Sequence, residues 1–412
     1  MKSKILKVFS FLLIVNIINS KFIFNSIYGW LFEPENSTEE SLALLFQSYR
    51  NKSIGGVNYL IDKDLNKTKR AARIAKQAGL QFFVWAPVLL ADEHARPEFY
   101  KKYPNEYVVN RNNQSTHEHY ISVPHYKFLD PSSDIVKQYL VEYYTNISKI
   151  EEIDGVNLDY IRFIEQYGDG IYAEGDTCYC QRCIKQFANL KKEDYFLLYS
   201  DFNALMLRQD WKDFRVNLIT SLVDLLKEAI HKQGKVVSAD VYPGPELSTW
   251  KTRQAWDKWP IDAVFPMLYY KIFGFPIEWI GQRTIEANLK LNYSVSLIPG
   301  LYVNDMSTQE FNQSLNLLTE NNAYGVSIFR LDQIGEDLFE VLKSFLKENS
   351  WFEVYSNKTC KNKYLVYNQS LIKNNLKYTN KLVEFDCFSY SKYIESLTNI
   401  FSLLIILILF IL

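Results

Sequence analysis

The feature that most constrains the fold is a repeated alternation of short apolar runs with helical segments. Eight runs consist mostly of apolar residues and end in a polar or turn residue, which is typical of strands buried on both faces. These runs are 26–32, 56–61, 81–87, 155–163, 236–242, 263–269, 295–302 and 325–331. Apolar residues at helical spacing lie between them, for example over 65–78, 135–150, 211–231 and 336–347. The pattern predicts an α/β protein with a (β/α)8 TIM barrel over residues 21–348.

An open doubly wound sheet is the alternative arrangement of such elements. No glycine-rich phosphate loop follows the first run, although a doubly wound sheet would often carry one there. Two connections are long, 89–128 after the third strand and 164–208 after the fourth. Both follow the carboxyl ends of strands, where TIM barrels build their active sites. We therefore predict that these two loops shape a binding cleft.

Both ends of the chain are apolar and resemble targeting signals. Two lysines precede an apolar run over 5–18, which predicts a secretory signal peptide over 1–20. An N-terminal membrane anchor is the alternative, although the run is short for a span. The uncharged end, 400–412, follows a polar spacer and predicts a GPI-attachment signal or short membrane anchor over 389–412. A polar C-terminal appendage, 349–388, precedes it.

Sequons of the Asn-x-Ser/Thr type support a secretory route. The sequence holds nine of them, which is more than its asparagine content would give by chance. They begin at Asn36, Asn51, Asn66, Asn113, Asn146, Asn292, Asn312, Asn357 and Asn368. We expect these positions to be glycosylated on the outer surface of the protein. The protein is thus expected outside the cytosol, at the cell surface or extracellular. GPI anchoring is the membrane contact that the tail predicts.

Five cysteines fit an oxidising compartment, where disulfides are stable. Cys360 and Cys387 lie late in the chain and are predicted to pair. Two of the three clustered residues Cys178, Cys180 and Cys183 are expected to form a disulfide as well. Cys180 with Cys183 is our working pair, although sequence spacing does not decide which cysteine is left over. A zinc site would need a fourth ligand at the usual spacing, and none follows, so no metal is expected.

Net charge and aromatic content indicate which classes of binding partner are favoured. The net charge is −1 and no basic stripe is present, which argues against a nucleic-acid partner. Aromatic residues make up 16% of the chain, with 29 Tyr and 8 Trp. Such rings stack on the apolar faces of sugars, but they also fill protein cores. A carbohydrate partner is therefore favoured, no cofactor is expected, and the sequence does not specify an oligomeric state.

The segment with the strongest functional signal is the fourth strand, which reads DGVNLDYIRF over 154–163. It places Asp159 after a buried run and Arg162 three residues later. Burying a charge is costly unless it is paired. Asp159 is therefore either a structural cap or a working group, and we favour the second because a long loop follows.

This segment resembles the fourth-strand signature of the glycosyl-hydrolase-like 10 barrels and their relatives. The similarity extends in order over about residues 25–348. It includes FFVWAP, FLDPSSDIVKQYL, CYCQRCIKQF, SADVYP, DAVFPMLYY and IPGLY. The resemblance implies a TIM barrel and glycoside hydrolysis, and it adds Asp240 in SADVYP as a second acidic residue at a strand end.

Glycosidases use two carboxyl groups across the scissile bond. We predict Asp159 as nucleophile or ion stabiliser and Asp240 as acid/base, with the reverse assignment open. Asp240 as a hydrogen-bonded strand cap is equally compatible with the sequence. Two departures from known barrels make the second catalytic carboxyl group the weaker part of this prediction. Ile161 stands where chitinase-type barrels have Glu, and the seventh strand does not supply the Glu nucleophile of many retaining barrels.

Residues near the strand ends could hold the sugar. Four of them carry rings that could stack on a sugar or bond a carboxylate: Trp85, Tyr269, Tyr270 and Tyr302. The Arg162 guanidinium could orient Asp159 or bind an acidic sugar. The sequence thus predicts a glycoside hydrolase. A catalytically inactive carbohydrate-binding glycoprotein on the same barrel is the alternative, and a structural surface antigen is a third.

Overall fold

The structure is a computed structural model that describes residues 24–93, 95–119, 127–165, 175–292 and 294–349, with the backbone of 363–370 and 377–384. Several sequence predictions lie outside these residues. They are the signal peptide over 1–20, the pair Cys360 and Cys387, the sequon at Asn357 and the tail signal over 389–412. No helix within the described ranges is long and apolar enough to cross a membrane.

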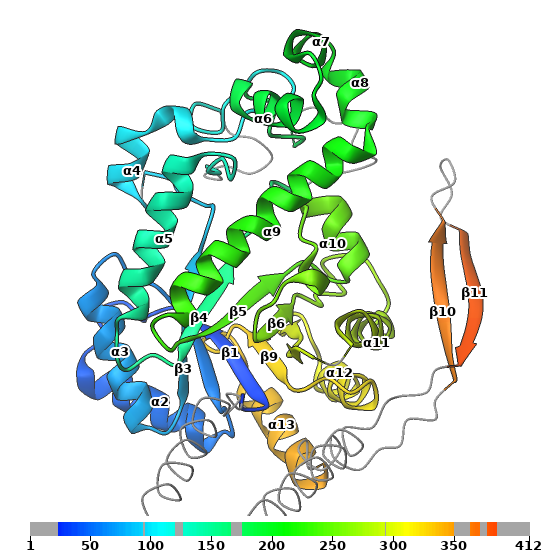
Figure 1. Ribbon diagram of the computed structural model, residues 1–412. Coiled ribbons are helices and arrows are strands. Elements are labelled where there is room, and N and C mark those ends of the chain that lie inside the picture. Colours follow the sequence, from blue (N-terminus) through cyan, green and yellow to red (C-terminus); the bar gives the residue numbers. More distant parts are fainter. Residues whose placement is uncertain are drawn as a thin grey trace, which may run out of the picture.

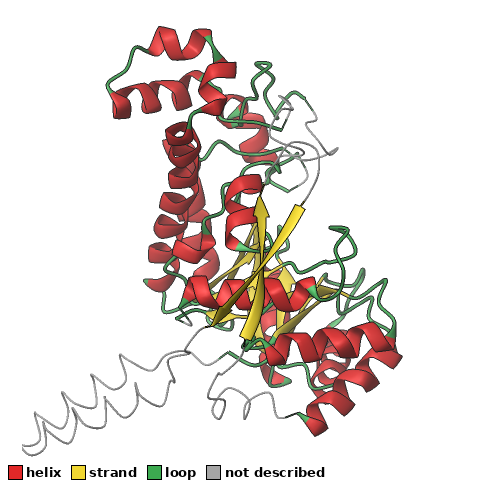
Figure 2. Cartoon of the chain, turned by 90° about the vertical axis from the view of Figure 1, so that its right-hand side faces the viewer, coloured by secondary structure: helices red, strands yellow, loops and turns green. Residues whose placement is uncertain are grey.

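Parallel strands form the centre of the molecule, and helices surround them (Figures 1 and 2). The strands are β1 (Ile27–Leu31), β2 (Gly56–Leu60), β3 (Gln81–Pro87), β4 (Gly155–Asp159), β5 (Val236–Val241), β6 (Ala263–Pro266), β7 (Ser296–Leu297), β8 (Gly300–Tyr302) and β9 (Val326–Phe329). Their order is β7-β6-β5-β4-β3-β2-β1-β9-β8. A parallel bridge between Met267 and Gly300 joins the chain after β6 to β8, which closes the sheet. The predicted TIM barrel is confirmed.

The predicted seventh strand is divided into two short strands. β7 pairs with β6, whereas β8 pairs with β9. Pro299 lies between them and has no N–H to donate to a ladder, which interrupts the pairing. Several other strands are shorter than predicted; for example, β4 ends at Asp159 rather than Phe163, and β6 ends at Pro266 rather than Tyr269.

Most helices cover the outer face of the barrel, and the others lie in the long loops at its carboxyl end. The helices are α2 (Glu39–Asn51), α3 (Leu65–Gln77), α4 (Pro97–Lys102), α5 (Asp134–Ser148), α6 (Gln181–Lys191), α7 (Tyr195–Ser200), α8 (Phe202–Leu207), α9 (Gln209–His231), α10 (Pro245–Thr252), α11 (Trp279–Leu291), α12 (Thr308–Glu320) and α13 (Glu336–Glu348). Local sequence explains several of their starts. The Ser133 hydroxyl accepts the Val136 N–H at the start of α5, and Ser307 with Glu310 forms a capping box on α12.

Alternation along each strand separates two apolar layers. Residues such as Val156 and Leu158 point outward and pack under the helices, whereas Tyr28, Phe83 and Phe265 fill the barrel interior. Gly155 is required where β4 passes β5, because a Cβ there would lie 2.5 Å from the Val236 carbonyl oxygen.

The barrel interior also holds a polar layer. Its members are fully buried and lie on β2, β4, β5 and β9, and they are Asn58, Asn157, Ser238 and Ser327. Each has at least one side-chain oxygen or nitrogen without a hydrogen-bond partner among the described residues. Buried polar atoms of this kind are normally satisfied by ordered water, so we expect hydration inside the barrel.

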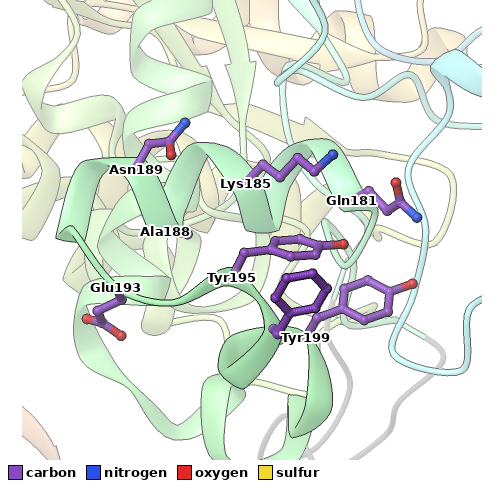
Figure 3. A pocket seen from close by; sticks show the side chains of 8 residues that line it. Gln181, Lys185, Ala188, Asn189, Glu193, Tyr195 and Tyr199 are labelled. Atoms are coloured by element: carbon purple, nitrogen blue, oxygen red, sulfur yellow. The ribbon is translucent and has the colours of Figure 1, made fainter.

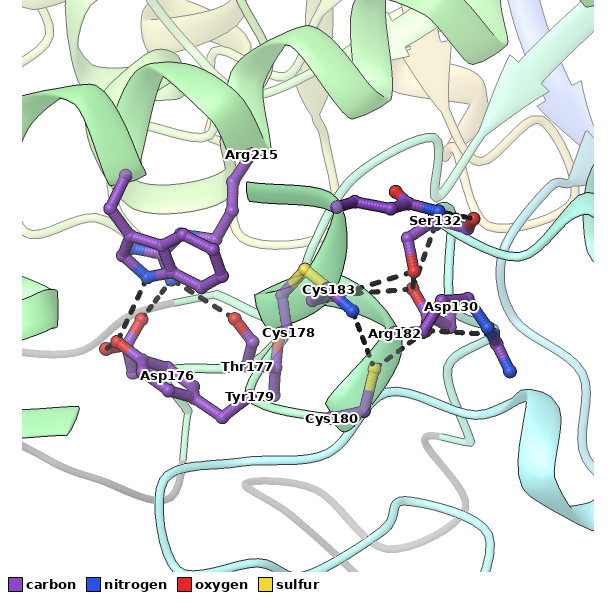
Figure 4. The surroundings of a disulfide bond; sticks show 12 residues. Asp130, Ser132, Asp176, Thr177, Cys178, Tyr179, Cys180, Arg182, Cys183 and Arg215 are labelled. Atoms are coloured by element: carbon purple, nitrogen blue, oxygen red, sulfur yellow. Dashed lines mark hydrogen bonds and ion pairs between the residues drawn. A yellow bond between two sulfur atoms is a disulfide. The ribbon is translucent and has the colours of Figure 1, made fainter. Parts of the chain in front are cut away.

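The connection after β4 contains the clustered cysteines, and the structure corrects our working pair. Cys178 bonds to Cys183, and Cys180 is a free thiol (Figure 4). Cys180 instead becomes the N-cap of α6, where its sulfur accepts the Cys183 N–H. Cys178 and Cys183 also lie with Asp130 in a group that could hold a metal ion, but the disulfide occupies both sulfurs.

We call residues 175–208, which include α6, α7 and α8, the β4 excursion. It stands beyond the carboxyl ends of the strands (Figure 1). An ion pair between buried Asp176 and Arg215 fixes its start to α9. The long loop after β4 therefore adds an ordered helical subdomain to the end of the barrel where an active site would lie.

The C-terminal appendage contains two strands, and the described sequon asparagines lie on the surface. β10 (Lys363–Ser370) and β11 (Lys377–Glu384) form an antiparallel hairpin within the predicted appendage. Seven of the nine sequon asparagines lie where side-chain exposure is described, and all seven are exposed: Asn36, Asn51, Asn66, Asn113, Asn146, Asn292 and Asn312. Asn368 is in β10, and its side chain lies outside the described part. Glycosylation itself stays a prediction.

Candidate active site

Asp159 and Asp240 lie on neighbouring strands at the carboxyl end of the barrel. β4 pairs with β5 as far as Leu158 and Ala239, and the next residue on each strand is one of the two aspartates. Residues in this register point to the same face, and neighbouring strands lie about 4.8 Å apart. Both side chains are therefore directed into the barrel mouth, where Asp159 is 7% exposed and Asp240 is 2% exposed.

Two N–H groups hold the Asp159 carboxyl group. The Trp85 indole Nε1–H donates to Oδ2 at 2.9 Å, and the Tyr160 backbone N–H donates to Oδ1 at 2.6 Å. Tyr160 has a φ of 48°, a left-handed conformation that side chains other than glycine rarely adopt. Strain of this kind is concentrated at functional sites. It ends β4 and turns the Tyr160 N–H toward the carboxylate.

The Asp240 carboxyl group is held in the same way by different partners. The Trp30 indole Nε1–H donates to Oδ2 at 2.9 Å, and the Asn157 Nδ2–H donates to Oδ1 at 2.9 Å. Asn157 is two residues before Asp159 on β4 and therefore faces the same interior. Each aspartate thus receives one indole N–H and one amide N–H.

Burial and mutual repulsion set the charges of the pair. Burial is the main cause that raises the pKa of Asp159, and the Arg162 charge and the two N–H donors oppose it. Burial raises the pKa of Asp240 well above its usual range, and the negative charge of Asp159 raises it further. Two like charges this close are not both stable. The pair therefore favours one ionised and one protonated carboxyl group, with Asp240 holding the proton.

Aromatic rings surround the two carboxyl groups. Phe329 at the end of β9 is the centre, with ring centroids of Trp30, Tyr269 and Tyr302 at 5.7, 5.7 and 6.1 Å and of Trp85 at 6.2 Å. Gly300 makes room for this packing, because a Cβ there would lie 2.7 Å from the Trp30 ring. Burial and the nearby aspartates raise the pKa of Tyr269 well above its usual range, so this hydroxyl stays neutral.

The structure brings most of the predicted site residues together. Trp85 contacts Asp159, Tyr269 and Tyr302 are in the aromatic group, and the Arg162 guanidinium lies 4.7 Å from the Tyr160 ring centroid. Tyr270 is different. It is buried, and its hydroxyl donates to Glu310 of α12 at 3.0 Å, so it belongs to the contact between the barrel and that helix.

Sequence reasoning missed three contributors to the site: Trp30, Asn157 and Phe329. Strand alternation contains the signal for each of them. Trp30 is near the end of β1, Phe329 ends β9, and Asn157 has the same facing as Asp159. An apolar run alone does not show which of its faces points into the barrel. Trp30 and Phe329 point inward, toward the site, whereas residues on the other face pack under the helices.

No family model matches the chain, and no curated protein is similar to it in sequence. Solved structures with the same fold include the PgaB (BpsB) glycoside hydrolase domain from Bordetella bronchiseptica, with a TM-score of 0.59, 13% identity and coverage of 78% of this chain and 98% of that one. The catalytic domain of β-amylase from Paenibacillus polymyxa matches with a TM-score of 0.56, 11% identity and coverage of 79% and 98%. A cold-adapted β-galactosidase from Rahnella sp. R3 has a TM-score of 0.59 and 12% identity, with 81% of this chain and 57% of that chain covered. The chain therefore shares the fold of these three solved structures, while the resemblance to the glycosyl-hydrolase-like 10 type stays a prediction.

Proposed function

We propose that this protein is a glycoside hydrolase that cleaves O-glycosidic bonds of an oligo- or polysaccharide through Asp159 and Asp240. The observation that carries the proposal is the carboxyl pair itself. Two buried aspartates with raised pKa values lie side by side at the catalytic end of a TIM barrel, within a group of aromatic rings. Perturbed pKa values at such a position are typical of catalytic acids and bases.

The electrostatics suggest a division of roles. Asp159 is the more exposed carboxyl group, and Arg162, Trp85 and the Tyr160 N–H stabilise its negative charge. It would face the anomeric carbon, as nucleophile or as stabiliser of the positive charge that develops there. Asp240 holds its proton more strongly and would donate it to the leaving oxygen.

The strand spacing suggests the stereochemical outcome. Neighbouring strands lie about 4.8 Å apart and the two aspartates follow paired residues, which favours a short separation between the carboxyl groups. Carboxyl groups about 5–5.5 Å apart are typical of retaining glycosidases, whereas inverting enzymes leave about 6.5–9.5 Å. We therefore expect retention of configuration at the anomeric carbon.

The aromatic group would supply the sugar contacts. Tyr302 is half-buried beside Phe329, and Phe32 packs at 5.1 Å from the Trp85 ring centroid. Rings at the mouth of a barrel stack on the C–H faces of a pyranose, and the Arg162 guanidinium would contact sugar oxygens. Arg162 would also favour a substrate with a carboxylate or sulfate group.

We further propose that the protein works outside the cytosol, at the cell surface or in the extracellular space, and that its tail is exchanged for a GPI anchor. The seven exposed sequon asparagines and the Cys178–Cys183 disulfide support the secretory part of this proposal. The anchor rests on the composition of residues 389–412.

Hydrolysis of a panel of aryl glycosides and polysaccharides tests the function. We expect activity in the wild-type protein and a loss of about a thousandfold or more in Asp159→Asn and Asp240→Asn. Asp154→Asn is the matched control, because Asp154 caps the Phe82 N–H at the opposite end of the barrel. Glycan binding without hydrolysis in the wild type would contradict the proposal and favour an inactive carbohydrate-binding protein.

A further inference from the structure

A pocket of about 660 Å³ lies on the β4 excursion, between α6 and α7 (Figure 3). α6 contributes one wall and α7 the other. The side chains that matter are Gln181, Lys185 and Asn189 from α6 and Tyr195, Phe196 and Tyr199 from α7. None of these residues contacts Asp159 or Asp240, so the pocket is separate from the candidate active site.

The α7 wall is aromatic and open to solvent. The rings of Tyr195 and Tyr199 are stacked, with centroids 5.4 Å apart and an angle of 30° between their planes. Phe196 lies 5.4 Å from Tyr195 and is 76% exposed, which is more than any other large apolar residue in the described structure. An exposed phenylalanine ring beside two stacked tyrosines offers an apolar surface to a ligand.

The α6 wall is polar. Gln181, Lys185 and Asn189 follow one another at intervals of four residues, which places them in a row on one face of the helix. All three are exposed, and the Lys185 Nζ lies 5.5 Å from the Tyr195 ring centroid. In Figure 3 the Tyr195 and Tyr199 rings lie opposite Gln181 and Lys185, with their hydroxyl ends toward Gln181. Amide and ammonium groups thus face a row of rings.

Several fixed contacts hold the pocket in shape. The Cys178–Cys183 disulfide ties the start of α6 to the preceding loop. The turn between α6 and α7 is held by Arg208, whose two Nη groups donate to the two carboxylate oxygens of Glu193 at 2.6 and 2.7 Å. A preformed pocket loses little entropy on binding, which favours recognition of a flexible ligand.

We propose that this pocket is a second carbohydrate-binding site, which holds a polysaccharide chain away from Asp159 and Asp240. Sugar rings present apolar C–H faces to aromatic side chains and hydroxyl groups to amides and charged groups, and the two walls offer these two kinds of contact. The excursion begins after β4 and stands at the same end of the barrel as the carboxyl pair, so one long chain could reach both sites. The identity of the ligand as a polymer rests on the proposed function.

The lining argues for sugar rather than protein. Ala188 is the only aliphatic residue in the lining, so the pocket offers rings and polar groups rather than a continuous aliphatic surface. Exposed leucines do occur nearby, but Leu190 and Leu197 do not line the pocket. Leu197 is a matched control, because it follows Phe196 on the same helix and is 72% exposed.

The test measures binding in an Asp159→Asn background, so that hydrolysis does not interfere. The full-length protein is run by affinity electrophoresis through gels that contain soluble starch, galactomannan or hydroxyethyl cellulose. We expect at least one polymer to retard the protein. Phe196→Ser and Lys185→Ala should each weaken that binding by about tenfold, whereas Leu197→Ser should leave it unchanged. Phe196 and Lys185 are exposed, so neither substitution threatens folding.

Four outcomes would overturn the proposal. They are no retardation by any of the polymers, an equal loss in Leu197→Ser, unchanged binding in Phe196→Ser, or a dimer in light scattering that Phe196→Ser converts to a monomer. Activity on a small aryl glycoside tests the proposed function separately. That activity should be the same in Phe196→Ser and in the wild type, since a small substrate does not need a second site.

Discussion

Trp30 and Asp240 are joined by an indole-to-carboxyl hydrogen bond of 2.9 Å, although they lie 210 residues apart in the sequence. The bond crosses the barrel mouth from β1 to β5. Asn157 donates to the other oxygen of the same carboxyl group at 2.9 Å. Both donors favour the ionised form and therefore oppose the rise in the pKa of Asp240 that burial and Asp159 cause.

The first prediction concerns the pH profile. Trp30→Phe or Asn157→Ala removes one donor, so the pKa of Asp240 should rise further. In the proposed mechanism Asp240 must hold a proton, so the alkaline limb of kcat/KM should move upward by about one pH unit. Ser238→Ala, a nearby interior change, is the control. An alkaline limb that moves downward would contradict the assignment of Asp240 as the acid.

The second prediction concerns stability. The pKa of Asp240 is higher in the folded protein than in the unfolded chain, so its ionisation destabilises the fold. This penalty is absent below the unfolded pKa and grows as the pH rises toward the folded pKa. Asp240→Asn removes it, and the Asn157 amide can turn over to accept from the new Nδ2. We expect the melting temperature to rise by about 2–4 °C at pH 7.

That increase should be absent near pH 3, where the unfolded carboxyl group also binds a proton. Calorimetry at both pH values measures the difference. Equal shifts at both pH values would mean that packing, rather than the charge of Asp240, explains the change.

The third prediction concerns Gln254, which is fully buried behind the site. Its Oε1 accepts the Tyr242 N–H at 3.0 Å and the Thr252 hydroxyl at 3.1 Å, and its Nε2 lies 3.5 Å from the Asp240 carbonyl oxygen. Gln254→Leu leaves these groups unpaired and should lower the free energy of unfolding by about 1–3 kcal/mol.

Gln254 positions the end of β5, so we also expect kcat to fall more than KM changes. Gln254→Glu keeps the acceptor but places a buried carboxyl oxygen against the Asp240 carbonyl oxygen, so it should also destabilise the fold. Urea unfolding and steady-state kinetics on the two variants measure these effects. A kcat that does not change in Gln254→Leu would limit this residue to a role in folding.

The fourth prediction concerns the cysteines. Peptide mapping without reduction should give a fragment linked through Cys178 and Cys183, with Cys180 alkylated only after unfolding. Burial raises the pKa of the Cys180 thiol, and the nearby Asp130 adds to the rise, so this thiol reacts slowly in the native state. Cys178→Ser should cost about 2 kcal/mol, the value for a short closed loop, whereas Cys180→Ser should cost less. A native crosslink through Cys180 would contradict the structure.

The fold was predictable because each buried strand is a nearly continuous apolar run. Parallel strands under helices need apolar residues on both faces, so the eight runs stand out without any alignment. Asp159 was singled out by the sequence of the fourth strand and Asp240 by the family resemblance, and the strand register shows that the two are neighbours.

Other features depended on three-dimensional contacts that sequence spacing does not contain. The choice of Cys178 over Cys180 depends on how the loop enters α6, where Cys180 is used as the N-cap. Tyr269 and Tyr270 are adjacent, and only the structure shows that the first joins the aromatic group while the second bonds to Glu310. The hydrogen bond from Trp30 to Asp240 required the closed barrel.

The interruption at Pro299 has a consequence for how the barrel moves. Between β6 and β8 the closure rests on a bridge at Met267 and Gly300 and on few backbone hydrogen bonds. Such a seam is where local opening costs least, and amide protons there should exchange with solvent sooner than those of β2, β3 and β4. Tyr269 and Tyr302 lie on either side of this seam. Local opening at the seam would widen the barrel mouth beside the carboxyl pair without unfolding the other strands.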